Sequence, residues 1–257
     1  MGKPFDIARF EEVLRTESFG RNLLFQPTVG STMDVARDAA AHGAAEGTLA
    51  LADEQTAGRG RLGRGWLTPP AVNLASTLVL RPAGAVTRQV PMMAPLAIVE
   101  AVFEVAGLRA DIKWPNDVQV AGNKLAGVLI ELLDNDGVVS LVGAGINVNL
   151  NASRYDEIKD IATSVAAETG REWGRELLLA AYLLHFERLY SAARRGESPR
   201  DAWRARLVTL GHRVHAQWPG GQADGIAEDV DDEGSLIVRT SNRNTVKVVA
   251  GDVTLRT

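Results

Sequence analysis

Three arginines alternate with glycines in the segment 58–66, which reads GRGRLGRGW. Arginine guanidinium groups are planar, permanently charged donors that suit phosphate or carboxylate groups. Glycines let backbone N–H groups approach a ligand closely, and the tryptophan can stack on a flat ring or cover the site. The segment therefore predicts a loop that binds a small anion, although a mobile, solvated surface loop could have the same composition.

The same segment contains GRGRLG, which matches the dinucleotide-binding pattern G-x-G-x-x-G. A helix should follow such glycines, whereas GRGWLTPPAVN carries two prolines and two glycines. The acidic residue expected about twenty positions later is missing, and Arg81 lies in that region. No G-x-x-x-x-G-K-[ST] occurs in the chain either, so neither a Rossmann site nor a P-loop is predicted.

Two further motifs add lysines, an acid and an amide to the arginines. KWPND at 113–117 lies at an expected strand end, where functional side chains often project, and Lys124 begins an apolar run. GAGIN at 143–147 has glycines in a strand-like run, which indicates close approach of another group. A plain turn, a solvated lysine and a β-bulge would each explain one motif. Together with Asp117 and Asn147, these cations are suited to activating a carboxylate with a nucleotide.

Helices and strands alternate in the part of the chain that must position these motifs. Hydrophobic periodicity and capping residues predict the following elements. We expect a short helix and an apolar segment in 5–24, helices at 33–42, about 92–106, within 151–170 and at 175–195, and strands at 48–53, 72–81, 110–117, 124–133, 138–145 and 146–150. After residue 207, five short strands separated by turn residues predict a small β-barrel or sandwich. We therefore expect two domains, 1–207 and 208–257.

Composition narrows the class of protein. The 257 residues include 46% hydrophobic residues, and the formal net charge of −4 argues against a general nucleic-acid coat protein. The chain has no cysteine, which excludes disulfides, thiolate nucleophiles and cysteine metal sites. No secretion signal and no uninterrupted apolar run of about 18 residues occurs. We therefore expect a cytoplasmic protein without a membrane span.

Five motifs occur in an order that resembles the biotin–protein ligases: GSTM (30–33), EQTAGRGRLGRGW (54–66), KWPNDV (113–118), KLAGVLIE (124–131) and GAGINVN (143–149). This resemblance runs from about residue 25 to 170, with a ligase-like C-terminal domain behind it. It implies an α+β fold, in which helices flank a mixed central β-sheet of the class II synthetase type, and a C-terminal SH3-like β-barrel. It also implies that ATP, as its Mg²⁺ complex, activates biotin to biotinyl-5′-AMP, and that biotin then passes to a lysine of a biotin carboxyl carrier protein.

The resemblance also implies roles for individual residues. The biotin-binding residues would be Ser31, Thr32, Gln55, Arg59, Gly60, Arg61, Lys124 and Gly127. The ATP and adenylate side would use Arg59, Arg61, Arg64, Trp66, Lys113, Asn116, Asn147 and Arg256. The catalytic residues would be Arg61, Lys113, Lys124 and Asp117, and no residue is assigned as a direct metal ligand because Mg²⁺ arrives with ATP. Met33 stands where many family members have asparagine, so a hydrogen bond from that side chain is lost.

Two alternative functions remain to be compared with this hypothesis. A lipoate or octanoate transferase shares the general fold, but octanoyl transfer commonly needs a cysteine, and lipoate ligases lack the paired arginine-loop and KWPND motifs. A biotin-responsive repressor would need a winged helix-turn-helix ahead of the catalytic part, and the segment before Gly30 holds one expected helix. We expect a ligase that does not bind DNA and is a monomer or a weak homodimer.

Overall fold

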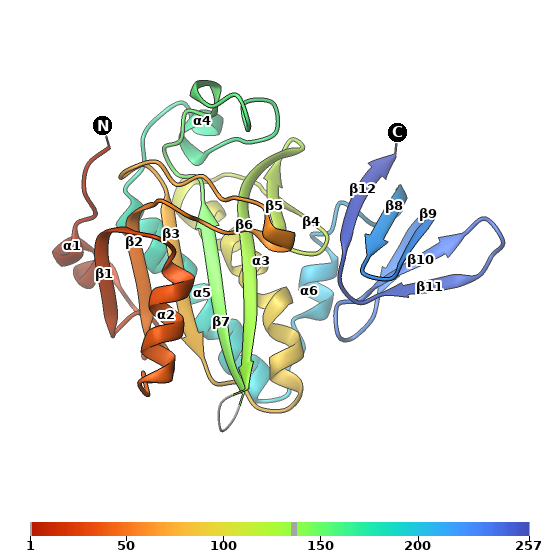
Figure 1. The fold of residues 1–257 in the computed structure, drawn as a ribbon, viewed down its shortest axis with the longest axis horizontal. Helices are drawn as coiled ribbons and strands as arrows, with labels where there is room; N and C mark the ends of the chain where they lie inside the picture. The colour runs from red at the N-terminus through yellow and green to blue at the C-terminus, as the bar shows by residue number, and fades with distance from the viewer. Residues whose placement is uncertain (1, 135–137, 257) are drawn as a thin grey trace.

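The computed structural model describes residues 2–134 and 138–256. A large part with a seven-stranded sheet lies beside a smaller five-stranded sheet, which is formed by the C-terminal segment (Figure 1). The mixed sheet flanked by helices, expected from the sequence, is confirmed.

The central sheet has the strand order β1-β2-β3-β7-β6-β5-β4. Its first pair, β1 and β2, is parallel, and all other neighbouring strands are antiparallel. The strands are β1 (Leu23–Val29), β2 (Leu49–Gln55), β3 (Leu74–Leu80), β4 (Asp111–Lys113), β5 (Asp117–Val120), β6 (Asn123–Asp134) and β7 (Val138–Ile146).

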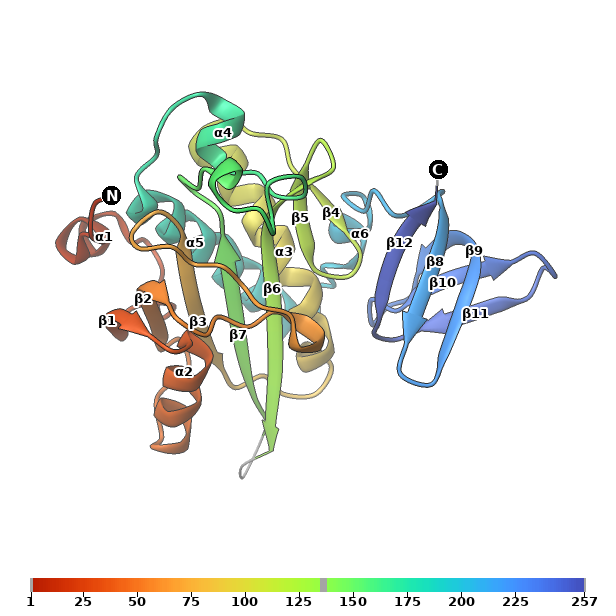
Figure 2. The same ribbon diagram turned by 45° about the horizontal axis from the view of Figure 1, so that its top comes forward.

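Helices cover both faces of this sheet because alternate side chains of its strands point to opposite sides. Leu49 and Leu51 of β2 belong to the main apolar core, whereas Ala50 packs with Met33 of α2 (Thr32–Ala41). The main core lies under α3 (Ala85–Ala106), and α5 (Arg175–Arg194) packs against α3 (Figure 2). Short helices α1 (Ile7–Val13), α4 (Val165–Thr169) and α6 (Arg200–Arg204) complete the large part.

Several element predictions were wrong or incomplete, and β1 and α6 were not predicted. α3 begins at Ala85 and contains Pro91 and Pro95, because its extensive burial offsets the hydrogen bonds that the two prolines remove. The short strand β5 (Asp117–Val120) was missed between the KWPND turn and Lys124, and residues 147–150 do not form a strand of their own. The errors at β5 and at 147–150 have the same cause: these segments are short, and their residues show little hydrophobic pattern from which a strand could be predicted or excluded.

By length and composition alone, helix α3 is long and apolar enough to cross a membrane. Inside this fold it serves as the main core helix, since 61% of its apolar window is buried. This resemblance to a membrane span is therefore weak evidence for one.

The C-terminal segment folds into one antiparallel sheet with the order β11-β10-β9-β8-β12. Its strands are β8 (Arg213–Trp218), β9 (Gly221–Val230), β10 (Leu236–Thr240), β11 (Thr245–Val248) and β12 (Asp252–Arg256). All five expected strands are present. In the part of the chain that the structure describes, β11 and β12 do not pair, so these strands are the two edges of the sheet.

Candidate active site

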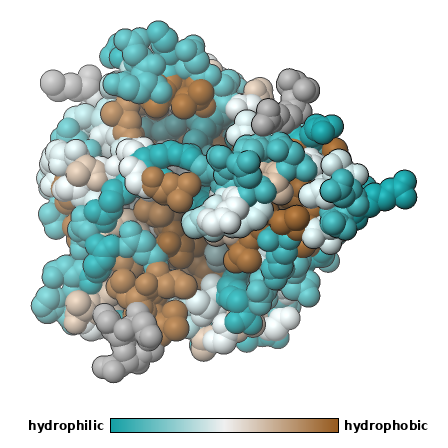
Figure 3. Space-filling view, turned by 45° about the vertical axis from the view of Figure 1, so that its right-hand side comes forward, coloured by the Kyte–Doolittle hydropathy of each residue, from teal (hydrophilic) through white to brown (hydrophobic). Residues whose placement is uncertain are grey.

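A cavity of about 520 Å³ brings together residues that lie far apart in the sequence. Its walls come from the start of α2, the loop 58–66, the KWPND turn, strands β6 and β7, and the first residues of β12. On the side of the molecule drawn in Figure 3, apolar surface is recessed between hydrophilic segments. The residues predicted from the sequence that line the cavity are Ser31, Thr32, Gln55, Arg59, Gly60, Arg61, Arg64, Trp66, Lys113, Asn116, Asp117, Lys124, Gly127 and Asn147.

Arg256 is the predicted residue that is missing from this lining. Its backbone pairs with Arg213 between β12 and β8. Its side chain lies outside the described residues, so its predicted contact with the nucleotide stays a prediction.

One end of the cavity is a small polar network at the N-terminus of α2. Ser31 caps this helix, and its Oγ accepts a hydrogen bond from the backbone N–H of Met33. Thr32 donates to Gln55 Oε1 from its backbone N–H at 2.9 Å and from its hydroxyl at 3.1 Å. The amide nitrogen of Gln55 donates to Thr68 Oγ1 at 3.1 Å. These contacts fix hydroxyl and amide groups in one orientation, which suits recognition of a neutral polar ligand such as a urea.

Trp66, at the end of the arginine loop, lies on a pair of glycines in the central sheet. Gly127 of β6 and Gly145 of β7 are directly opposite partners in the ladder. A Cβ on Gly145 would come closer than 3.0 Å to the indole, so only glycine leaves room for the ring. The indole Nε1 is buried and has no hydrogen-bond partner among the described residues. The close approach expected at GAGIN is therefore made by Trp66.

Lys124 lies over this tryptophan and forms an ion pair with the acidic residue of the KWPND turn. Its Nζ is 5.4 Å from the centroid of the Trp66 ring and 2.7 Å from Asp117 Oδ1. Both side chains of the pair remain partly exposed to the cavity, at 35% and 29%. An arriving anion can therefore reach the ammonium group without first opening a buried ion pair.

Asn147 is nearly fully buried, and both polar atoms of its side chain are already engaged. Its Oδ1 accepts from Asn73 Nδ2 at 3.1 Å, and its Nδ2 donates to the backbone oxygen of Lys124 at 3.4 Å. This arrangement positions the backbone of Lys124. A direct contact of Asn147 with ATP or its metal stays a prediction, and the sequence contained no signal for its partner Asn73.

Two cations that line the cavity, Arg61 and Lys113, have no carboxylate partner among the described residues. Arg61 donates to two neutral acceptors, Asn116 Oδ1 and the backbone oxygen of Gly251, each at 2.9 Å. Burial lowers the pKa of Arg61 from its ordinary value, although nearby Asp117 opposes this effect. Within residues 2–134 and 138–256, the ammonium group of Lys113 has no hydrogen-bond or ion-pair partner. These two groups therefore give the cavity positive charge that is suited to an anionic ligand.

The two remaining arginines of the loop connect it to opposite sides of the cavity. Arg59 makes a bidentate contact with Asp34 of α2, at 2.7 and 2.8 Å. The hydrogen bonds from Arg59 are the largest cause that lowers the pKa of Asp34. Arg64 pairs with Asp252 of β12. Neither acid was predicted from the sequence to belong to the site. The one local signal was the position of Asp34, three residues after the residue that caps α2.

Met33, the residue that departs from the family pattern, lines the cavity and is 3% exposed. A Cβ on Gly143 would lie 2.9 Å from its sulfur atom, so the absence of a side chain at 143 gives the thioether its room. Met33 therefore contributes an apolar wall where asparagine would contribute an amide.

Comparison with known proteins supports what this geometry suggests. A family model described as the biotin/lipoate A/B protein ligase family matches residues 25–149, and one described as the biotin protein ligase C terminal domain matches residues 209–256. The chain is 36% identical over 249 residues to the bifunctional ligase/repressor BirA of Bacillus subtilis, covering 94% of this chain and 76% of that protein. It is 34% identical to the biotin–[acetyl-CoA-carboxylase] ligase of Mycobacterium tuberculosis, covering 95% of this chain and 92% of that one.

A solved structure of a biotin protein ligase has a fold similar to that of this chain. The biotin protein ligase from Aquifex aeolicus in complex with biotin and ATP is similar with a TM-score of 0.80 at 29% identity, over 92% of this chain and 99% of that chain. Both family models, the curated relatives and this structure agree on one family: the chain belongs to the biotin/lipoate A/B protein ligase family, within it to the biotin protein ligases.

Proposed function

We propose that the chain activates biotin with ATP and transfers the biotinyl group to a lysine of a biotin carboxyl carrier protein. In the first half-reaction a carboxylate oxygen of biotin bonds to the α-phosphorus, and the bond from this phosphorus to the bridging oxygen of pyrophosphate breaks. In the second, the lysine amine bonds to the acyl carbon and AMP departs with the oxygen of the mixed anhydride. The solved Aquifex aeolicus relative, described as a complex with biotin and ATP, supports both substrates.

The observation that carries this proposal is the uneven distribution of charge along one cavity. Neutral hydroxyl and amide groups line the cavity at the start of α2, and Lys124 lines it from β6. Arg61 and Lys113 line it from the loop and the KWPND turn, and among the described residues neither has a carboxylate partner. Two anions repel each other when a carboxylate approaches a triphosphate. Fixed cations on both sides of the meeting point offset this repulsion and stabilise charge at the phosphorus, without a covalent enzyme intermediate.

We assign the predicted residues accordingly. Ser31, Thr32 and Gln55 hold the ureido end of biotin, and Gly60 and Gly127 allow its backbone contacts with the loop and sheet. Lys124 binds the biotin carboxylate and the α-phosphate. Arg61, Lys113 and Asn116 bind phosphate oxygens, and Arg64 lies at the exit of pyrophosphate. Trp66 covers the ligand and holds it away from water.

Asp117 has a role in orientation during the first half-reaction. Its contact with Lys124 at 2.7 Å holds the ammonium group toward the cavity. Once the phosphates engage Lys124, the carboxylate is released to accept or orient the proton that the incoming lysine amine loses. We propose that Mg²⁺ enters as part of the ATP substrate.

Transfer of labelled biotin to a carrier domain tests the proposal. We expect the wild-type chain to label the carrier only when ATP and biotin are both present, and lipoate in place of biotin to give no adenylate. Arg61→Ala and Lys124→Ala each remove one charge-stabilising donor, so the transfer rate should fall by about 10²–10³. Arg188→Ala serves as control because Arg188 is an exposed arginine of α5, away from the cavity. Carrier labelling without ATP, or equal rates in all variants, would contradict the proposal.

We place the domain boundary near residue 208, where the chain leaves β4 after the hydrogen bond from Val208 N–H to Ile112 O. We propose a cytoplasmic location because the reaction consumes ATP. We further propose that the chain does not bind DNA and is a monomer or weak homodimer, which a gel-shift assay and a sedimentation measurement would test.

A further inference from the structure

Trp114 belongs to the KWPND motif, yet its indole is directed at the C-terminal sheet. The indole N–H donates to the backbone oxygen of Gly234 at 2.9 Å, and the backbone N–H donates to Thr209 Oγ1 at 2.9 Å. The side chain is almost completely buried, with 2% exposed. Both partners lie about one hundred residues further along the chain, at 95 and 120 positions. The motif that lines the nucleotide side of the cavity is therefore also a contact between the two sheets.

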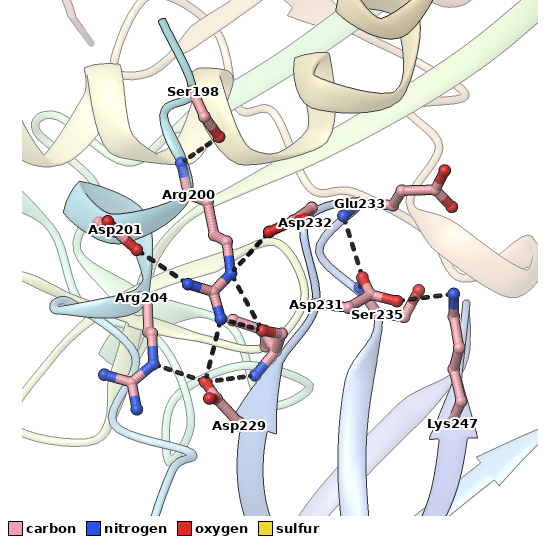
Figure 4. A network of polar contacts seen from close by, with 11 residues as sticks. Ser198, Arg200, Asp201, Arg204, Asp229, Asp231, Asp232, Glu233, Ser235 and Lys247 are labelled. Carbon is pink, nitrogen blue, oxygen red and sulfur yellow. Dashed lines mark hydrogen bonds and ion pairs between the residues drawn. The ribbon is translucent and has the colours of Figure 1, made fainter.

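The turn that receives this hydrogen bond is rigid. Asp231 accepts backbone hydrogen bonds from Ser235 at 2.8 Å and Glu233 at 3.0 Å, and it pairs with Lys247 of β11 at 2.6 Å (Figure 4). Gly234 has a φ of +81°, in the left-handed region that favours glycine. Because the turn has a fixed shape, a contact to its carbonyl oxygen orients the whole C-terminal sheet.

Two arginines of α6 also bind the C-terminal sheet, at the end of β9 next to the turn that contacts Trp114. Arg200 donates to the backbone oxygen of Val230 at 2.6 and 3.1 Å, and Arg204 contacts Asp229 at 2.5 Å (Figure 4). Arg200 also lies 3.5 Å from Asp232. These contacts join the last helix of the large part to the turn between β9 and β10, beside the contact made by Trp114.

The other end of the C-terminal sheet reaches the arginine loop. Arg61 donates to the Gly251 oxygen and Arg64 pairs with Asp252. Asn116, which accepts from Arg61, is two residues after Trp114. Trp114, Asn116, the loop and the C-terminal sheet therefore form a closed ring of contacts around the nucleotide side. Among the residues that the structure describes, no hydrogen bond or ion pair joins the C-terminal sheet to Ser31, Thr32 or Gln55.

We infer that Trp114 is a positioning residue, which docks the C-terminal sheet so that Gly251 and Asp252 hold the loop arginines over the nucleotide. The inference rests on the proposed function, because it assigns ATP to this side of the cavity. Loss of the Trp114 hydrogen bond loosens the sheet and weakens the binding of ATP, while biotin binding at the opposite end changes little.

A second buried tryptophan at the same interface offers a matched control. Trp203 is 1% exposed and lies beside Gly234, but its indole N–H has no hydrogen-bond partner in the part of the chain that the structure describes. Trp114→Phe removes an indole that makes a hydrogen bond, and Trp203→Phe removes one that does not. Both changes keep an aromatic ring in the core. Arg200→Gln is a further variant, which weakens the same docking contact from α6 without changing the core.

Hydrogen exchange and steady-state kinetics on the full chain test the inference. Loss of one buried hydrogen bond corresponds to about a five- to thirtyfold change in an opening equilibrium. We expect exchange in peptides covering 228–236 and 249–254 to be faster by this factor in Trp114→Phe than in Trp203→Phe. The KM for ATP should rise at least threefold more than the KM for biotin, and Arg200→Gln should shift both readouts in the same direction.

Three outcomes would overturn the inference: equal exchange in the two tryptophan variants, equal shifts in both KM values, or no effect of Arg200→Gln. These outcomes are distinct from failure of the proposed function. In that case the wild-type chain itself would not form the adenylate, whereas the exchange difference between the tryptophan variants would still be measurable.

Discussion

The glycine pair beneath Trp66 gives a sharp test of how the loop closes over the ligand. In Gly145→Ala, the added methyl group would lie less than 3.0 Å from three atoms of the indole, namely Cε2, Nε1 and Cζ2. The backbone of β7 cannot yield, because Gly145 is paired on both sides, with Ala75 of β3 and Gly127 of β6. The tryptophan must therefore move, and the loop with it.

The size of this displacement sets the expected loss of activity. Ordinary van der Waals contact begins at 3.4 Å, so the ring must move by about 1 Å. Misplacement of positioning groups by about 1 Å can cost on the order of 10²-fold in rate. We therefore expect the rate of biotinyl-adenylate formation to fall about 100-fold in Gly145→Ala. Fold stability should change little, since the new methyl group meets a movable loop.

Biotin-dependent release of pyrophosphate from ATP measures this rate, with thermal unfolding as a check on folding. Gly65→Ala is the control, because a Cβ there meets nothing within 4 Å in the same loop. A double-mutant cycle isolates the mechanism: in a Trp66→Leu background, Gly145→Ala should add less than a threefold loss. Near wild-type activity of Gly145→Ala, or an undiminished loss in the Trp66→Leu background, would refute the reasoning.

Two further predictions concern charges outside the reacting centre. Asp34→Asn removes the bidentate partner of Arg59, and because this pair is exposed we expect the KM for biotin to rise by only about two- to fivefold, a difference that disappears at high ionic strength. Glu187→Gln weakens the backbone hydrogen bonds that Glu187 accepts from residues 17–19, so the free energy of unfolding in urea should fall by about 1–2 kcal/mol. Burial alone would raise the pKa of Glu187, but these hydrogen bonds outweigh it and lower the pKa below its ordinary value of 4.5. Glu187 therefore contributes fully to the free energy of unfolding above pH 4.5, and this contribution is lost as the pH falls through the folded-state pKa. The difference in the free energy of unfolding between wild type and Glu187→Gln should vanish in acid.

Local sequence patterns predicted most of the elements correctly because their physical causes are local. Ser31 before an alanine-rich run caps α2, and glycines at 107 and 170 end α3 and α4 in the left-handed conformation. The glycines of GAGIN likewise indicated a close approach. The expected start of α3 at about residue 92 was too late, because tertiary burial outweighs the cost of Pro91 inside the helix.

The sequence by itself determined which chemistry is available, since the arginine loop, KWPND and Lys124 carry the charges that a carboxylate and a triphosphate require. Only the tertiary structure decided how these groups are used. It paired Arg59 with Asp34, left Arg61 with neutral acceptors, turned Asn147 toward Asn73 and directed Trp114 at Gly234. These partners lie 25 to 120 positions apart, and no local pattern links them. Hydrogen-bond and packing partners are chosen when strands and domains assemble, because only then do the groups come within contact distance.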